Sequence, residues 1–147
     1  MAKYNLQEKK EKPALYRTAI KPEIIDEIYE QILKKMIVEK RYREAKYTAQ
    51  KLAEEIGTNS RYISAAVSLR FQCNFSELIA GYRVREAIAL LTDKRTRGWT
   101  MAEVAQACGF ANRQSFYAAF YRIQKKSPRQ YQDEFFAKMG YPRHNKQ

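Results

Sequence analysis

The sequence predicts an all-α protein, and three observations support this fold class. Gly and Pro are scarce, with five and four residues in a chain of 147. The alternation of apolar and polar residues that marks half-buried strands is missing between turn signals. Apolar residues recur instead at the spacing of amphipathic helices, segment after segment. We therefore expect a domain of seven helices.

The composition allows a packed core in a strongly basic chain. Hydrophobic residues make up 45% of the sequence, and 28 Lys and Arg against 16 Asp and Glu give a net charge of +12. Such an excess favours a polyanionic partner, which is DNA, RNA or an anionic membrane surface. No apolar run is long enough to span a membrane, and residues 1–12 lack the apolar core of a secretion signal. We therefore expect a cytoplasmic protein that crosses no membrane, and the motifs below favour DNA as the polyanion, with no membrane partner.

The residue types offer little for metal binding or catalysis. Cys73 and Cys108 stand singly, and the only histidine, His144, lies near the C-terminus. Paired carboxylates, a Gly-rich phosphate loop and a nucleophile–base pair are all missing. We therefore expect no metal, no cofactor and no catalytic residue. We interpret both cysteines as buried or half-buried thiols in a reducing compartment.

Three helices are predicted in the first half of the chain. Residues 1–21 form a basic segment that we interpret as a flexible tail, the alternative being an arm that contacts phosphate. A helix over residues 22–40 begins with Pro, which suits a first turn. The next helix, residues 48–57, begins with a capping Thr and ends at a Gly. The third follows a short turn and covers about residues 60–70.

The second half of the chain has clearer helix-start signals. A long fourth helix over about residues 75–92 follows Asn74 and Glu77, which have the spacing of a capping box. Thr100 and Glu103 form another capping box, and we expect Trp99 to pack into the core beside it. The other expected segments are a charged turn at 93–98, helices at 100–109, at 112–124 and from 127 onward, and a C-terminal tail at 141–147.

Two segments of the chain repeat the same spacing of small and apolar residues. They are Ala53, Gly57, Ile63 and Val67, and then Ala105, Gly109, Phe116 and Phe120, with one extra residue in the second turn. Ala lets two helices approach closely, Gly ends the first helix, and the apolar pair packs the second helix onto it as core. We therefore predict two helix-turn-helix subdomains, at about 48–70 and 100–124, joined by the long linking helix.

Acidic residues are absent from both predicted recognition helices. No Asp or Glu occurs from Ile56 to Ser76, and none occurs from Val104 to Gln132. A basic surface that is merely solvated would mix both signs of charge, so this pattern favours contact with phosphate. We therefore predict binding to double-stranded DNA.

These motifs resemble the DNA-binding domain of the AraC/XylS regulators. The family's second-motif signature, I-A-x-x-x-G-F followed by F, F and P-x-x-Y, is similar to Val104–Phe110, Phe116, Phe120, Ser127-Pro128 and Tyr131. Leu52–Gly57 resembles the first motif, and Tyr82–Leu91 resembles the linking helix. The resemblance covers about residues 24–131. It implies a bacterial transcription regulator, in particular an activator, with its DNA-binding domain at residues 22–140.

The chain departs from that family at a few positions. Val67 replaces a usual Phe, Gln72 and Cys73 replace a common Gly, Lys125 and Lys126 replace another, and Ala65 stands where many members carry a long base-contacting side chain. Many members also carry a β-rich sensor domain, which residues 1–21 are too short to form. We therefore expect a standalone DNA-binding protein, or one expressed without its sensor domain.

The length of the linking helix suggests how the protein binds. Recognition helices must lie about 34 Å apart to enter successive major grooves on one face of DNA. A linking helix over residues 75–92 is about 27 Å long at ~1.5 Å per residue. We therefore expect a monomer to read two successive major-groove segments. The activator role that the resemblance implies makes RNA polymerase a candidate partner.

Base contacts are expected from outward positions near the starts of the two recognition helices. Arg pairs with guanine and Gln with adenine through two hydrogen bonds, and an Ala methyl can meet a thymine methyl. The alternative for each Arg is a phosphate contact or a solvated side chain. The expected base-contacting residues are Arg61, Ser64, Ala65, Ser68, Arg113, Gln114, Tyr117 and Ala118.

Phosphate contacts are expected where helix N-termini or cations face the DNA, because free N–H groups and the helix dipole attract anions. The expected residues are the helix caps Ser60, Asn112 and Ser127 and the cations Arg122, Lys125 and Lys126. Of Arg83 and Arg85, we expect one to pair with Glu86 or Glu77 and the other to reach phosphate.

Three other functions stay open from the sequence. The same DNA-binding domain could serve an accessory factor of a mobile element or a recombination system. An enzyme would need clustered titratable residues, which are missing. A membrane-surface or RNA-binding protein would prefer vesicles or RNA over duplex DNA.

Overall fold

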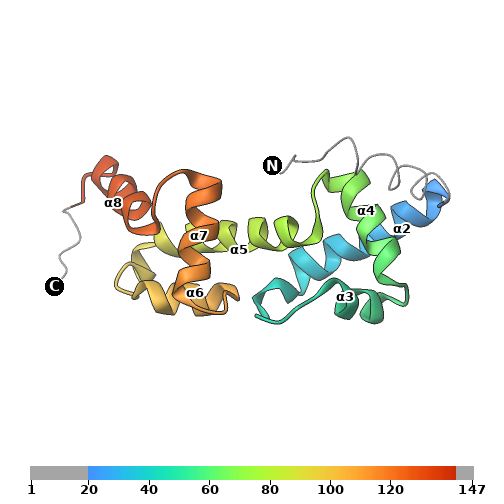
Figure 1. Ribbon diagram of the computed structural model, residues 1–147. Coiled ribbons are helices and arrows are strands. Elements are labelled where there is room, and N and C mark those ends of the chain that lie inside the picture. Colours follow the sequence, from blue (N-terminus) through green and yellow to red (C-terminus); the bar gives the residue numbers. More distant parts are fainter. Residues whose placement is uncertain (1–19, 142–147) are drawn as a thin grey trace. The chain divides into compact units, whose positions relative to one another are not determined.

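The computed structural model describes residues 20–141, and within them it has seven α-helices and no strand. The predicted all-α fold is confirmed (Figure 1). Most of the two expected terminal tails, residues 1–19 and 142–147, lies outside the described residues. The chain divides into two compact units. The first holds the chain up to Lys40 and Tyr47–Leu78, and the second holds Arg41–Lys46 and the chain from Ile79 onward.

In the described part of the first unit, a recognition-type helix packs on two others. Helix α2 (Pro22–Leu33) begins with its predicted Pro and continues as a π-helical turn η1 (Lys34–Val38). Helix α3 (Ala49–Ile56) and helix α4 (Ser60–Phe71) follow. The face of α2 that carries Ile25, Ile28 and Ile32 is buried. Helix α4 packs against both α2 and α3, and α2 also contacts α3, so the buried face of α2 contributes to the core of this unit.

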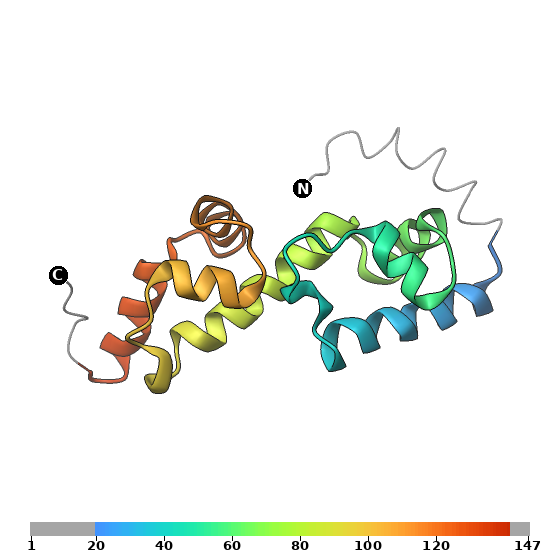
Figure 2. The same ribbon diagram turned by 90° about the horizontal axis from the view of Figure 1, so that it is seen from below.

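The second unit combines the linking helix with the last three helices. Helix α5 (Phe75–Leu91) starts in the first unit and runs on without a break into the second. It is followed by the 3₁₀ turn η3 (Lys94–Thr96) and helix α6 (Met101–Cys108). Helix α7 (Arg113–Gln124) crosses α6, and helix α8 (Pro128–Lys138) packs against α7 (Figures 1 and 2).

The core of the second unit is aromatic beneath α7. Phe116 and Phe120 are fully buried, and their rings meet edge to face at 5.8 Å. Phe110 packs on Phe116 from the turn before α7, and Tyr131 packs on Phe120 from α8. Ile63 and Val67 are likewise fully buried in the first unit. All four predicted core residues of the repeat are therefore confirmed as core.

Two helices end in a left-handed conformation at a residue other than glycine. Gln72 follows α4 with φ 60°, and Lys125 follows α7 with φ 63°. These are the two turns where Gln72 and Lys125 stand in place of the Gly that the sequence resemblance led us to expect. A side chain in this region costs roughly 1–2 kcal/mol because its Cβ approaches the following carbonyl.

Residues 20–141 contain neither a membrane-spanning helix nor a metal-binding cluster. No helix in this part of the chain is long and apolar enough to cross a membrane. No cluster of three His, Cys, Asp or Glu side chains suited to a metal ion occurs there either.

Both cysteines are free thiols, with Cys108 buried and Cys73 half-buried as predicted. Burial raises the pKa of Cys108 to about 12, so its thiol stays protonated at neutral pH.

Candidate nucleic-acid interface

The first helix-turn-helix motif consists of α3 and α4. The Thr48 side chain accepts a hydrogen bond from Lys51 N and so caps α3 as predicted. Gly57 ends α3 with φ 81°. The predicted cap of α4 is off by one residue. Asn59, rather than Ser60, is the N-cap, and its Oδ1 accepts a hydrogen bond from Tyr62 N at 2.9 Å. Asn tolerates the extended cap conformation and has the acceptor that the first turn needs.

The outward face of α4 carries three of the four expected base-contacting residues. Arg61 and Ser64 are exposed, and Ser68 is half-buried. Ala65 is only 2% exposed, so the expectation that it contacts a base is wrong. The reason is that α4 packs against both α2 and α3, which buries three consecutive residues starting at Ala65. A buried methyl group has no surface left for a thymine methyl.

The second motif consists of α6 and α7 and has the predicted caps at both helices. Thr100 and Glu103 form the capping box of α6, with Glu103 N donating to Thr100 Oγ1 at 3.1 Å. Gly109 ends α6 with φ 101°. Asn112 caps α7 by accepting a hydrogen bond from Ser115 N at 2.8 Å. Trp99 is 36% exposed, so its expected place in the core is wrong.

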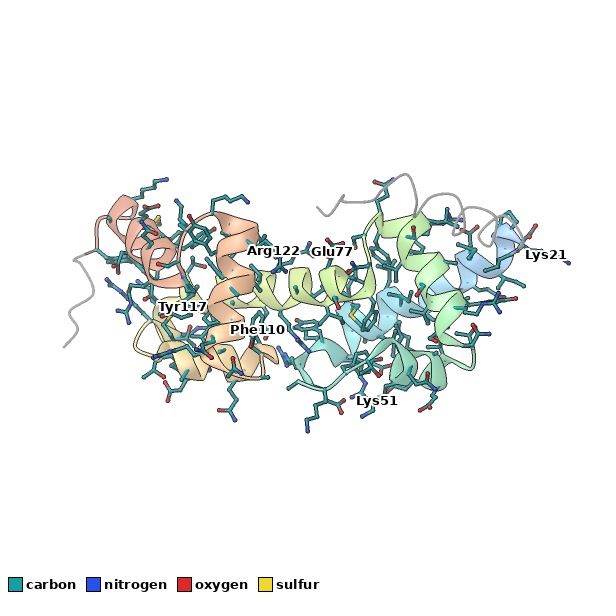
Figure 3. The ribbon with its side chains drawn as sticks, in the orientation of Figure 1. Lys21, Lys51, Glu77, Phe110, Tyr117 and Arg122 are labelled. Carbon is teal, nitrogen blue, oxygen red and sulfur yellow. The ribbon has the colours of Figure 1, made fainter. Side chains whose placement is uncertain are left out.

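All four expected base-contacting residues of α7 reach the surface. Arg113, Gln114 and Ala118 are exposed. Tyr117 is half-buried because its ring packs edge to face on Phe116 at 5.8 Å, and Figure 3 labels it beside α7. The backbone N–H groups of the first turn of α7 stand next to Arg113 and Gln114. A helix start of this kind favours anions as well as base edges.

Sequence reasoning missed one residue on this face of α7. Tyr121 is 59% exposed, although large aromatic side chains are usually buried. It follows Gln114 by two helical turns and Tyr117 by one, so it continues the same face. This periodicity was available in the sequence. Tyr121 lies beyond the helix start, where base contacts are usually expected, so periodicity is the signal that identifies it.

The expected phosphate-contacting residues differ in their surroundings. Arg122, which Figure 3 labels, and Lys125 are exposed near the end of α7. Lys126 instead donates to Glu134 on α8, which partly neutralises its charge. Ser127 caps α8 and accepts a hydrogen bond from Gln130 N, so its expected capping role is confirmed. Ser60 is the first residue of α4 and still lies in the amide-rich first turn.

The arginines of α5 behave differently from the expectation. Arg83 donates to two backbone carbonyl oxygens, that of Tyr42 at 2.8 Å and that of Glu44 at 3.0 Å. Arg85 is exposed and lies over the ring of Tyr82 at 5.2 Å. Glu86 pairs with Arg43 instead.

Glu77 does not pair with either arginine. Its Oε1 accepts a hydrogen bond from Asn74 N at 3.0 Å, which completes the predicted capping box at the start of α5. The contacts observed for Arg83 and Arg85 are thus those with the backbone of residues 42–44 and with the Tyr82 ring, and a pair with Glu77 is not among them.

The fold and these two motifs define a class of protein. Residues 52–134 match the family model of a helix-turn-helix domain, which covers more than half of the chain. The chain is thus a sequence-specific DNA-binding protein that regulates transcription. It belongs to the AraC/XylS family, as the residues of its second motif suggest. No curated protein sequence matches the chain as a relative.

Solved structures share this fold. The DNA-binding domain of the global transcriptional factor AdpA, solved with a target DNA, has a TM-score of 0.67 and 19% identity, over 78% of this chain and 97% of that chain. The C-terminal domain of the response regulator yesN from Fusobacterium nucleatum has a TM-score of 0.61 and 24% identity, over 70% of this chain and 97% of that one. The C-terminal domain of the response regulator AraT from Geobacillus stearothermophilus has a TM-score of 0.62 and 23% identity, over 76% and 84%.

Proposed function

We propose that the protein reads a bipartite duplex site, with α4 in one major-groove segment and α7 in the next. The observation that carries this proposal is the pair of recognition helices. Each is capped by Asn, free of acidic residues, and lined on its outward face by exposed polar side chains. Helix α5, with 17 residues, is about 26 Å long at ~1.5 Å per residue. That length suits two recognition helices spaced about one turn of DNA apart.

The roles of the side chains follow from their chemistry and exposure. In α4 we assign base contacts to Arg61, Ser64 and Ser68, and in α7 to Arg113 and Gln114, with Tyr117 and Ala118 beside them. Arg can bind guanine and Gln can bind adenine, each through two hydrogen bonds. We assign phosphate contacts to the helix starts at Ser60, Asn112 and Ser127 and to the cations Arg122, Lys125 and Lys126. Such contacts orient the protein on the duplex without reading its sequence.

The family supports several further parts of the proposal. We propose that residues 22–140 form the DNA-binding domain, that the protein binds as a monomer, and that it activates transcription with RNA polymerase as its partner. A DNA ligand would place it at the bacterial nucleoid in the cytoplasm. AdpA, whose DNA-binding domain has the same fold, was solved with a target DNA, which supports duplex DNA as the ligand.

The test is a selection from random duplex DNA with the whole chain, followed by footprinting of the enriched sequence. Two protected blocks about 10 base pairs apart are expected, one for each recognition helix. Single-stranded RNA and anionic vesicles serve as competitors. A single protected block, equal affinity for all duplexes, or stronger binding to RNA or vesicles would each overturn the proposal.

A further inference from the structure

The second unit contains a short segment that precedes the first helix-turn-helix motif in the chain. This segment, Arg41–Lys46, is called the strap below, and it belongs to the second unit although residues on both sides of it belong to the first. Tyr42 in the strap is only 5% exposed, and its ring stacks on that of Tyr82 in α5 at 5.8 Å between centroids.

Glu86 of α5 holds the strap through both of its carboxylate oxygens. Tyr42 Oη donates to Glu86 Oε1 at 2.5 Å, and Arg43 Nε donates to the same oxygen at 2.9 Å. Arg43 Nη2 donates to the other oxygen, so the Arg43–Glu86 ion pair is bidentate. Burial and the neighbouring carboxylate raise the pKa of Tyr42, so its hydroxyl stays protonated and remains a donor. Arg83 binds the strap backbone one turn earlier on the same helix.

The other side of the strap lies against the turn that leads into α7. A Cβ atom at Gly109 would come within 2.3 Å of the Tyr42 carbonyl oxygen and 2.8 Å of Arg43 Cα. The guanidinium of Arg83 also lies over the ring of Phe110, the next residue, at 5.8 Å. Phe110 in turn packs on Phe116 inside α7. Contacts therefore run without interruption from Glu86 through the strap and the turn to the recognition helix.

We propose that Glu86 and Arg83 are positioning residues for base recognition by α7, acting through the strap on the turn at Gly109. This role rests on the proposed function, because it concerns the helix that would read the second half of the site. Base-contacting side chains must be held within about 0.5 Å of their productive geometry by the residues that support them. Because the strap lies between α5 and the turn, it fixes the orientation of the start of α7 and so the direction in which the side chains of Arg113 and Gln114 point.

The experiment separates positioning from stability. A variant that merely unfolds more easily has less active protein, which weakens binding to every duplex by the same factor and leaves the preference between duplexes unchanged. A variant with a displaced α7 loses its preference in one half of the site only. The half read by α7 is identified first, as the half where Gln114→Ala loses its preference. Affinities are then measured for three duplexes. They are the selected duplex, a duplex with one base pair changed in the α7 half, and a duplex with one base pair changed in the other half.

Glu86→Gln is the main variant, and Tyr42→Phe is a milder one that keeps the ring and removes one hydrogen bond. A base-pair change usually weakens binding by about 1–3 kcal/mol, or roughly 5- to 150-fold. The preference in each half is the ratio of the affinity for the selected duplex to the affinity for the duplex changed in that half. We expect Glu86→Gln to bring this ratio close to one in the α7 half and to leave it unchanged in the other half. Tyr42→Phe should change the ratio in the same half, by less.

Asp93→Asn is the matched control, since it also removes one carboxylate that pairs with an Arg in the second unit. Its partner Arg95 is 88% exposed at the side chain and lies in a turn outside the strap. The control should raise the affinity for all duplexes slightly through its lost negative charge and leave both ratios unchanged. If both Glu86→Gln and Tyr42→Phe keep the wild-type affinity ratio in the α7 half, the positioning role is overturned. A wild-type protein without preference in either half would instead show that the proposed function itself is wrong.

Discussion

Gly57 and Gly109 occupy equivalent places in the two motifs but have very different neighbours. Each ends the first helix of its motif in a left-handed conformation, with φ 81° at Gly57 and 101° at Gly109. A Cβ at Gly57 would meet nothing within 4 Å, whereas one at Gly109 would strike the Tyr42 carbonyl. The same residue type is therefore needed for backbone conformation alone at one site, and for conformation and space at the other.

This difference predicts unequal costs for the same substitution. Gly57→Ala should lower the free energy of unfolding by about 1–2 kcal/mol, because only the left-handed strain is added. Gly109→Ala should cost about 2–5 kcal/mol, because displacement of the strap adds roughly 1–3 kcal/mol for overpacking. Urea unfolding followed by circular dichroism measures both, and each variant serves as the control of the other. Equal losses would show that the strap does not lie against the turn.

The left-handed residue after α4 predicts a stabilising substitution. Gln72→Gly removes the Cβ from a position with φ 60° and should raise the free energy of unfolding by about 0.5–1 kcal/mol. Gln72→Ala is the control, because it shortens the side chain and keeps the strained Cβ. Thermal and urea unfolding should rank Gly above Ala at this position. The opposite order would mean that the Gln72 side chain stabilises the turn by more than the backbone strain costs.

Gln114 tests base recognition by α7. Replacement by Ala should weaken binding to the selected duplex by about 1–3 kcal/mol and relax the preference at a single base pair, because a two-pronged contact with a base edge is lost. Gln106, an exposed glutamine on α6, is the matched control, and its replacement by Ala should change neither quantity. If Gln114→Ala weakens all duplexes equally, the residue contacts phosphate or nothing, and base reading by this position is excluded.

Arg122 and Lys126 should differ in their share of phosphate binding. Arg122→Ala should reduce the slope of log affinity against log salt by about 1, since one neutralised phosphate is lost. Lys126→Ala should reduce it by less, because Lys126 already pairs with Glu134. Filter binding or fluorescence anisotropy across a salt series measures the slopes. A larger effect for Lys126 would mean that its pair with Glu134 opens when DNA binds.

Local chemistry made much of the fold readable from the sequence. The capping boxes at Asn74, Thr100 and Ser127 act over three residues, so the pattern alone identifies them. The buried pair Phe116 and Phe120 was readable from helical spacing for the same reason. The cap of α4 was missed by one residue because Asn59 and Ser60 are both good caps, and only the backbone decides between them.

The rest of the site depends on contacts between residues far apart in the chain. Ala65 could not be recognised as buried, because its burial requires α4 to pack on α2 as well as on α3. The partners of Glu86 lie 43 and 44 residues earlier, in a segment without any repeat or motif. Helical periodicity carries no information about such pairs. Only the folded structure shows that Tyr42 and Arg43 contact Glu86.

The strap has a consequence for how the protein is made. During synthesis the ribosome releases Arg41–Lys46 long before the turn at Gly109 exists, so Tyr42 must wait for its place until α6 has emerged. We expect the amino-terminal unit to fold once its own helices have emerged, and the second unit to close last, around a piece of chain that was translated early. A fragment cut out from Ile79 onward would lack that piece. We expect such a fragment to be loosely packed and prone to aggregation.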